Sequence, residues 1–259
     1  MTKLWRNPMA TSRVDTKRRY RPLVALKALR TLLRDKEDTK QVFTIVDALG
    51  GPAFEKMYRR FRTQANALEI LERPRMLCDV LGDRAYLGSL PEGSLGRDYL
   101  AFVEREQITA DGLVAASDEG YQSDRQTLDP LMRRLGERLR DSHDLYHVLG
   151  QYGRDGMGEL NVLAFTHGVS GNPGILLVVL GGIHKLRQEY PEQRTLAMVY
   201  QSWQLGRAAT FLPGADWEAL LPVQTGEVRR MLGIGTPTLY HASGLKDSET
   251  PQGVMPVAA

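Results

Sequence analysis

The spacing of leucines and other large apolar residues constrains the fold of this chain more than any other feature of its sequence. Leu23, Leu26, Leu29 and Leu33 recur at intervals of three to four residues, which places them on one face of an α-helix at 22–34. Similar spacing recurs along most of the chain, and no segment alternates polar and apolar residues over the length of a strand. The sequence therefore predicts an all-α fold, a single-domain bundle of many helices.

Helix-starting and helix-ending residues divide this pattern into elements. Asp129 followed by Pro130 predicts a helix start, because Asp accepts a free N–H and Pro has none to satisfy at the first position. We expect that helix to continue to about residue 149. The pair Gly50 and Gly51 predicts the end of one helix, with another beginning at Pro52. Later helices are predicted at Glu159–Gly168, Ile175–Gln188, Glu192–Leu212 and Glu227–Leu232.

Charge is distributed unevenly along the chain. Residues 1–22 carry seven Lys or Arg against one acid, a net of +6, whereas the remaining 27 basic and 30 acidic residues give a net of −3. A nucleic-acid-binding domain carries its basic charge on a folded surface, so this distribution argues against a nucleic-acid partner. We expect a basic, flexible arm at 1–20, a helical domain at 21–240 and a flexible tail at 241–259. The arm is consistent with a solvated segment, a segment that contacts anionic lipid, or a short transit peptide.

Cysteine content and hydropathy exclude two further classes. The single cysteine, Cys78, rules out an intramolecular disulfide framework and a zinc site built from several cysteines, and it suits a reducing compartment. The longest apolar run, Ile175–Ile183, has nine residues. That is about half of the roughly 18 apolar residues that suggest a membrane span.

A cluster of histidine and carboxylate residues carries the clearest chemical signal. His143 and His147 are four residues apart, so they lie about 40° apart around a helix, and Asp144 falls within the same arc of about 100°. Two imidazoles and a carboxylate on one side of a helix are what a divalent ion requires. Eleven residues, four of them glycine, separate His147 from Glu159. A returning helix is therefore expected to place Glu159 opposite the histidines as another oxygen ligand.

The surroundings predicted for this cluster leave two interpretations open. A helical wheel drawn from Leu131 puts both histidines at the edge of the apolar stripe, so we expect a site that is partly sheltered and partly open. The same residues also allow an ordinary polar cluster in which Asp144 pairs with His147. Glu159 alone is weaker evidence for a metal site, because the helix dipole favours a Glu in the first turn of any helix.

Two known metal-site patterns fit the cluster poorly. The zincin pattern H-E-x-x-H uses its Glu as a general base, and here that position is Asp144, one methylene shorter, which argues against a metalloprotease. The HD-type phosphohydrolases need a histidine upstream of their His-Asp doublet, and no histidine precedes His143. An unrelated soluble hydrolase that shares only a His/Asp cluster is a third hypothesis, after the two that are given below.

The pattern H-D-x-x-H, followed by eleven residues and Glu, resembles the signature of the ubiquinone (coenzyme Q) biosynthesis protein 4 family. All four motif positions are intact, namely His143, Asp144, His147 and Glu159. The similarity covers roughly residues 20–240. The supporting blocks are Leu90–Val103, His143–Leu160, Ser202–Leu212 and Trp217–Ile234.

The resemblance implies an all-helical protein at the membrane periphery whose four motif residues hold a divalent metal and form the catalytic centre. Zinc is the first candidate, and a redox-active metal is the alternative, because zinc cannot change its oxidation state. The implied reaction is an oxidative decarboxylation, in which a hydroxyl replaces the C1 carboxylate of a polyprenylated precursor derived from 4-hydroxybenzoate. The alternative is a non-catalytic, lipid-binding scaffold that organises the ubiquinone biosynthetic enzymes.

The resemblance also implies partners and a location. The partners are the polyprenylated benzoate precursor, other ubiquinone biosynthesis proteins and a membrane surface, and homodimer formation stays open. The location is the cytoplasmic, inner face of the membrane in a bacterium, or the matrix face of the mitochondrial inner membrane in a eukaryote.

A polyprenyl substrate needs a long apolar groove, and the run beginning at Ile175 is the best candidate for part of its wall. Ile175, Leu177 and Val178 are apolar, and Gly181 and Gly182 would let a lipid chain approach the backbone. The alternative is an ordinary buried helix, because a helix that is apolar all round usually lies in the core.

One cation close to the motif is a further candidate. Arg154 lies in the loop before Glu159 and could pair with the carboxylate of a substrate. The alternative is a structural ion pair with the neighbouring Asp155.

Overall fold

The chain folds into a bundle of α-helices. The computed structural model describes residues 19–35, 38, 40–108 and 129–245. The predicted arm at 1–20 and tail at 241–259 lie largely outside the described residues. Within those residues the structure has no strand, only one isolated antiparallel bridge between Ser94 and Gln224. The all-α prediction is confirmed.

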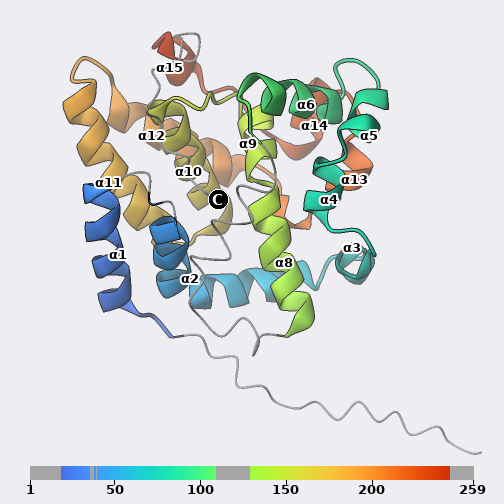
Figure 1. The fold of residues 1–259 in the computed structure, drawn as a ribbon, viewed down its shortest axis with the longest axis horizontal. Coiled ribbons are helices and arrows are strands. Elements are labelled where there is room, and N and C mark those ends of the chain that lie inside the picture. The colour runs from blue at the N-terminus through green and yellow to red at the C-terminus, as the bar shows by residue number, and fades with distance from the viewer. Residues whose placement is uncertain (1–18, 36–37, 39, 109–128, 246–259) are drawn as a thin grey trace, which may run out of the picture.

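Nearly all of the described elements are α-helices (Figure 1). In chain order they are α1 (Pro22–Arg34), α2 (Lys40–Phe61), α3 (Ala67–Glu72), α4 (Leu77–Leu81), α5 (Arg84–Ser89), α6 (Leu95–Arg105), α8 (Pro130–Asp141), α9 (His143–Gly150), α10 (Gly156–Ser170), α11 (Pro173–Glu189), α12 (Thr195–Ala208), η2 (Leu212–Gly214), α13 (Trp217–Leu220), α14 (Thr225–Leu232) and α15 (Thr238–His241). None of the described helices is long and apolar enough to span a bilayer.

The middle of the bundle is helix α10. Every residue from Met157 to Phe165 is buried, which is expected of a helix that is surrounded by other elements. Helices α11 and α12 pack on one side of α10, and α9 contacts it on the other (Figure 1). Because α9 and α10 carry the predicted metal ligands, those ligands lie in the core.

Helix α2 passes through the position where the sequence predicted a break. The predicted helix end is wrong, because Gly50, Gly51 and Pro52 all lie inside this one helix. Pro52 has no N–H, so the carbonyl of Ala48, four residues earlier, loses its helical donor. The backbone N–H of Arg21, just before α1, donates to that carbonyl at 2.8 Å. The proline is thus accommodated by a hydrogen bond that also fixes the start of α1 on α2.

Packing explains the glycine at position 50. A Cβ atom there would lie 2.3 Å from the side-chain nitrogen of Asn172, so the position has no room for a side chain. Asn172 caps α11 by accepting a hydrogen bond from the N–H of Gly174 at 2.8 Å. The glycine therefore serves the contact between α2 and α11, where the sequence pattern had suggested a helix end.

Candidate metal centre

A break between two helices at Ser142 lies directly before both histidines. The single helix predicted from Pro130 to about residue 149 is wrong: α8 ends at Asp141 and α9 begins at His143. The predicted start is confirmed, because the Asp129 carboxylate accepts hydrogen bonds from the N–H groups of the first turn of α8. Most residues of α9, which follows Ser142, are buried.

Both imidazoles are buried. His143 is 2% exposed and His147 is 1% exposed, so neither lies at a partly open helix edge as the wheel drawn from Leu131 predicted. The wheel assumed one continuous helix, and the break at Ser142 removes that assumption. Asp144 is half-buried, on the outer side of the pair.

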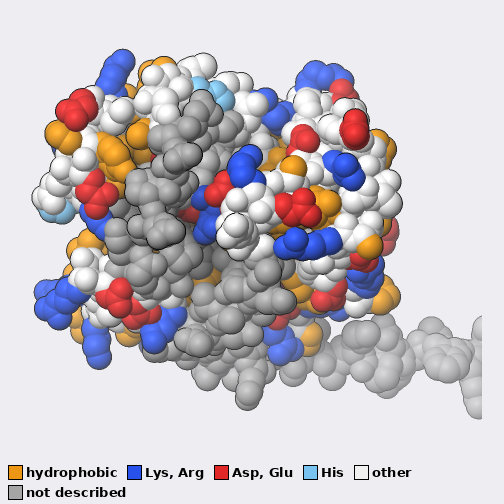
Figure 2. Space-filling model, turned by 45° about the horizontal axis from the view of Figure 1, so that its top comes forward, with side chains coloured by type: hydrophobic (Ala, Val, Ile, Leu, Met, Phe, Trp, Pro, Cys, Tyr) orange, Lys and Arg blue, Asp and Glu red, His pale blue; other side chains and the backbone are white. Residues whose placement is uncertain are grey.

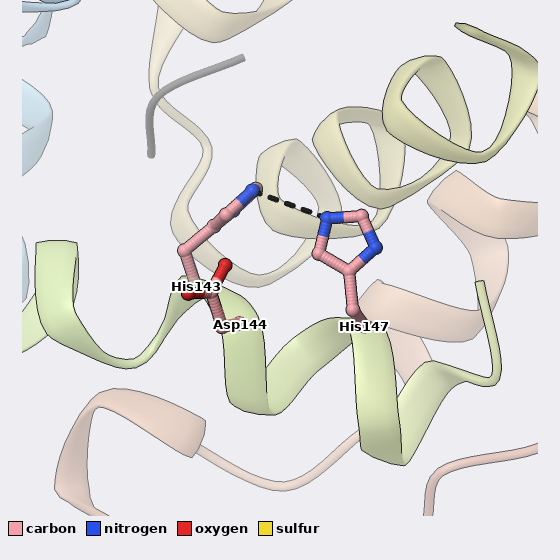
Figure 3. A group of neighbouring side chains, drawn as sticks. All are labelled: His143, Asp144 and His147. Carbon is pink, nitrogen blue, oxygen red and sulfur yellow. Dashed lines mark hydrogen bonds between the residues drawn. The ribbon is translucent and has the colours of Figure 1, made fainter. Parts of the chain in front are cut away.

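Three nitrogen and oxygen atoms converge between α9 and α10. The Nε2 atoms of His143 and His147 are 3.3 Å apart, and the planes of the two rings are nearly perpendicular, at 86° (Figure 3). The Oε2 atom of Glu159 lies 3.4 Å from Nε2 of His147 and 3.8 Å from Nε2 of His143. A ligand atom of Asp144 lies within 4.8 Å of ligand atoms of both histidines. Asp144 and Glu159 therefore both lie near the two histidines.

These separations fit a small divalent ion. Ligands about 2.0–2.1 Å from a tetrahedral zinc ion are about 3.3–3.4 Å from one another. Among the described side chains, Oε2 of Glu159 has no hydrogen-bond partner although the residue is 1% exposed. A buried carboxylate oxygen without a partner is costly, so the donor set fits a bound cation.

The ring of His147 is held in one orientation. Its Nδ1 atom lies 3.4 Å from the carbonyl oxygen of Tyr152, and its face stacks on Phe102 with ring centres 5.5 Å apart. When Nδ1–H donates to that carbonyl, the lone pair of Nε2 points toward His143 and Glu159. Metal-binding histidines commonly use such a hydrogen bond to fix their tautomer.

Charge at the site favours an ionised carboxylate. Burial would raise the pKa of Glu159, but the positive charges of the nearby His147 and His143 lower that pKa to about 2. Burial would lower the pKa of His147, whereas the negative charge of Glu159 raises that pKa by more. The carboxylate is thus charged at neutral pH, as a metal ligand must be.

The loop that leads into α10, which carries Glu159, is fixed by the last described helix. The Asp155 carboxylate caps α10 by accepting hydrogen bonds from the first-turn N–H groups at 3.0 Å. The hydroxyl of Tyr240, on α15, donates to the other oxygen of Asp155 and accepts from the N–H of Gly153 at 3.0 Å. A residue 85 positions beyond Asp155 therefore fixes the start of α10, and with it Glu159.

A cavity adjoins the histidine side of the site. Its volume is about 130 Å³, and it lies between α2, α8, α10 and α11. His143 lines it, together with Arg133, Arg140 and Asp47. The apolar part of the wall is formed by Val46, Ala53, Phe54, Met57, Met132, Leu139, Leu163, Val169, Ile175 and Pro213.

The lipid wall predicted on α11 corresponds only in small part to this cavity. Ile175 lines the cavity, but Val178 is in the core and Leu177 packs against it. Gly181 faces α1, and Gly182 faces Leu160 of α10. Of the predicted wall residues Ile175 thus lines this cavity, and the lipid-binding role of the run stays a prediction.

The structure also places Arg154. Its Nε atom lies 3.3 Å from Oε1 of Glu159, so it pairs with the motif carboxylate instead of with Asp155. That contact leaves Oε2 of Glu159 facing the histidines.

Three residues of this region were not identified from the sequence. Arg140 lies three residues before His143 and is 5% exposed, and its spacing from the motif could have drawn attention to it. Gly136 lines the cavity from α8, and its position on the apolar side of that helix was a second available signal. Tyr240 had none, because its contact with Asp155 crosses 85 residues.

Comparison with known proteins assigns this geometry to a family. The sequence profile described as coenzyme Q (ubiquinone) biosynthesis protein Coq4 matches residues 11–238. The chain belongs to the Coq4 family. Its catalogued relatives include a mitochondrial ubiquinone biosynthesis protein COQ4 from Meyerozyma guilliermondii, 28% identical over 78% of this chain and 62% of that protein. Another, from Aspergillus terreus, is 32% identical over 64% of this chain and 54% of that protein.

The relatives are longer than the region that they share with this Coq4-family chain. The chain spans about half to three fifths of the length of the relatives it matches. A solved structure of a ubiquinone biosynthesis protein from Nostoc punctiforme covers 84% of this chain and all of its own, with a TM-score of 0.60. At 20% identity, that likeness establishes the common fold.

Proposed function

We propose that this Coq4-family protein acts in ubiquinone biosynthesis as a metal-dependent enzyme. The reaction removes the C1 carboxylate of a polyprenylated precursor derived from 4-hydroxybenzoate and leaves a hydroxyl in its place. One observation carries the proposal: His143, His147 and Glu159 converge with metal-ligand spacing at the wall of a largely apolar cavity. Family membership supports the pathway, and the cavity supports a ligand with a large apolar part.

The chain's own residues have distinct roles in this proposal. The apolar wall receives the prenylated part of the substrate and keeps water from it. Arg133 and Arg140 are the basic residues of the lining, and Arg140 forms a buried ion pair with Asp141. A guanidinium binds a carboxylate with two parallel hydrogen bonds, so Arg133 orients the substrate's carboxylate toward the histidines.

His143, Asp144, His147 and Glu159 would hold the divalent ion. When bound, that ion supplies positive charge next to the carboxylate that leaves as CO₂. Replacing a carboxylate by a hydroxyl is a two-electron oxidation of the ring, so an external oxidant such as O₂ must accept the electrons. Zinc suits the spacing of the ligands, and a redox-active metal suits the chemistry.

The setting follows from the substrate. A polyprenylated benzoate resides in a bilayer, so we propose that the protein works at a membrane surface beside other enzymes of the pathway. The mitochondrial relatives support the matrix side of the inner membrane as the location in a eukaryote.

The variant His147→Ala tests the proposal. The purified variant should lose its bound metal in elemental analysis and keep its helical circular dichroism spectrum. A cell that depends on it should accumulate a precursor that retains the carboxyl group. The matched control is His184→Ala, because His184 is exposed on α11 and contacts Gln188, away from the site.

Two results would contradict the enzyme proposal. Ubiquinone production restored in full by the metal-free variant would favour the non-catalytic scaffold. Accumulation of a precursor that has already lost its carboxyl group would place the protein at another step of the pathway.

A further inference from the structure

Helix α1 carries apolar residues on its outward face as well as on its inward face. Its inward face is made by Ala25, Ala28 and Leu32, which are buried, and Val24 and Leu29 pack against the same core. Its outward face carries Leu23, Leu26 and Leu33, which are 81%, 42% and 52% exposed. A helix that only stabilises its own domain buries its large residues. These outward leucines therefore indicate a partner outside the bundle.

The same outward face is basic. Lys27, Arg30 and Arg34 are exposed, and α1 contains no acidic residue. At 100° per residue the three leucines span an arc of about 80°, and the three cations span an arc of about 60° that overlaps it at Leu23. None of the three cations forms an ion pair within the described part of the chain. The face therefore combines an apolar stripe with a row of positive charge.

The apolar stripe continues onto the neighbouring helix. The side chain of Leu33 lies 3.7 Å from where a Cβ on Gly181 would be, so it packs onto α11. On α11, Leu180 is 54% exposed and Leu176 is 39% exposed. Helices α1 and α11 lie side by side in Figure 1. Lys and Arg side chains gather at the lower left of Figure 2, with hydrophobic side chains beside and above them.

Helix α1 also contacts the wall of the cavity. The guanidinium of Arg21, directly before α1, forms an ion pair with Asp47, which is buried and lines the cavity. The backbone N–H of Arg21 bonds to Ala48. The outward face of α1 is thus one helix away from the space assigned to the substrate.

We propose that the outward face of α1, with the exposed leucines of α11, docks this protein on an anionic lipid bilayer. Leucines at this spacing enter the boundary between headgroups and acyl chains, and the adjacent lysine and arginines contact the phosphates. The surface rests on the proposed function only for its purpose, which is to bring the cavity to a membrane-resident substrate.

Charge complementarity distinguishes a bilayer from a second copy of the chain. In a symmetric dimer built on this face, the cations of one α1 would oppose the cations of the other. Like charges brought together in an interface are repulsive. An anionic surface instead pairs with all of them, and the net charge of +6 over residues 1–22 has the same sign.

Vesicle flotation of the full chain tests this proposal. The probes are phosphatidylcholine vesicles with and without phosphatidylglycerol. The variant Leu23→Gln/Leu26→Gln/Leu33→Gln should partition onto the anionic vesicles at least about tenfold more weakly, because each leucine loses apolar area that enters the bilayer. Glutamine keeps the helix propensity of leucine. The control is Leu68→Gln, since Leu68 is 52% exposed on α3.

Further variants separate the components of the surface. The pair Leu23→Gln/Leu26→Gln, which leaves the contact of Leu33 intact, should show the same direction of change with an unaltered melting temperature. Lys27→Gln/Arg30→Gln/Arg34→Gln should reduce the preference for anionic over neutral vesicles.

The outcomes distinguish membrane docking from dimer formation and from a role in metal binding. Flotation of the leucine variants equal to that of the unmodified chain would overturn it. So would a dimer in light scattering that disappears in the leucine variants while flotation persists. Elemental analysis of the same variants should show undiminished bound metal, so a failure of docking is separate from a failure of the metal centre.

Discussion

At the scale of single residues, the site depends on one buried carboxylate shared by two imidazoles. Oε2 of Glu159 faces His143 and His147, while Arg154 holds the other oxygen. Each histidine must be neutral to bind a metal, yet Glu159 favours the protonated form of His147. Protons and metal therefore compete for the same nitrogen.

This competition predicts the pH dependence of metal binding. In the metal-free protein Glu159 raises the pKa of His147 above its ordinary value of 6.5. Zinc affinity should thus begin to fall at a higher pH than for an ordinary histidine site, by about tenfold per pH unit for each proton displaced. Chelator competition across mildly alkaline to mildly acidic pH measures this. An affinity that does not change over that range would contradict the assignment of His147 as a ligand.

Removing the charge of Glu159 should change both metal binding and the protonation of the histidines. We expect Glu159→Gln to weaken zinc binding by more than about a hundredfold. The histidine pKa in the metal-free variant should fall, because the charge that raised it is gone, and NMR titration of the ring protons follows it. Glu192→Gln, at an exposed position, is the matched control. If both variants bind zinc equally well, Glu159 is no ligand.

The ligand identities could be predicted from the sequence, whereas their surroundings could not. The spacing of His143, Asp144 and His147 follows from helix geometry, and the glycines before Glu159 allow the chain to return. The turn at Ser142 was not predictable, because no proline or glycine marks it. The hydrogen bonds of Tyr240 with Asp155 and Gly153 depend on packing between distant segments, which local patterns do not encode.

At the scale of elements, close contact between α10 and α12 holds the centre of the bundle. A Cβ on Gly206 would lie 2.1 Å from the carbonyl oxygen of Phe165, and a Cβ on Gly168 would lie 2.4 Å from that of Trp203. Both obstacles are backbone atoms, which cannot rotate away. The two helices approach as closely as they do because both positions are glycine.

The variant Gly206→Ala should therefore destabilise the fold. Although alanine favours a helix, the two backbones must separate, and we expect a loss of about 1–3 kcal/mol in the free energy of unfolding. Gly226→Ala on α14 is the control, because nothing lies within 4 Å of its added Cβ. That control should be stabilised by about 0.5 kcal/mol. Urea unfolding measures both, and equal effects would disprove the close contact.

The element pattern could be predicted where propensity and packing agree. The start of α8 at Asp129 and Pro130 was correct because cap and proline both act locally. The break expected at Gly50 was wrong because a distant N–H, that of Arg21, satisfies the carbonyl that Pro52 leaves free. Local signals mark where a helix is weak, and tertiary contacts decide whether it ends there.

At the scale of the whole molecule, three features line up through the bundle. The outward leucines of α1 lie at the surface, Asp47 behind them lines the cavity, and His143 lines the same cavity at the metal centre. If the cavity holds the substrate, filling it should abolish substrate binding while leaving both the metal centre and the membrane face intact. Such a result would separate the role of the cavity from the roles of the metal centre and of the membrane face.

Gly136 provides the means to fill it. This residue lines the cavity from α8, and a Cβ there would meet only Phe54, at an ordinary distance of 3.5 Å. We expect Gly136→Leu to weaken binding of a prenylated 4-hydroxybenzoate at least about tenfold, because the leucine side chain occupies the volume that the prenyl group needs. Leucine favours a helix over glycine, so the melting temperature should not fall.

The matched control is Gly226→Leu, which places the same side chain on an open helix surface. Both variants should retain their zinc and float with anionic vesicles, because neither substitution touches α1 or the ligands. Undiminished binding of the prenylated ligand by Gly136→Leu would mean that the substrate enters elsewhere. Loss of zinc from the same variant would mean instead that the cavity and the metal centre cannot be altered separately, since His143 belongs to both.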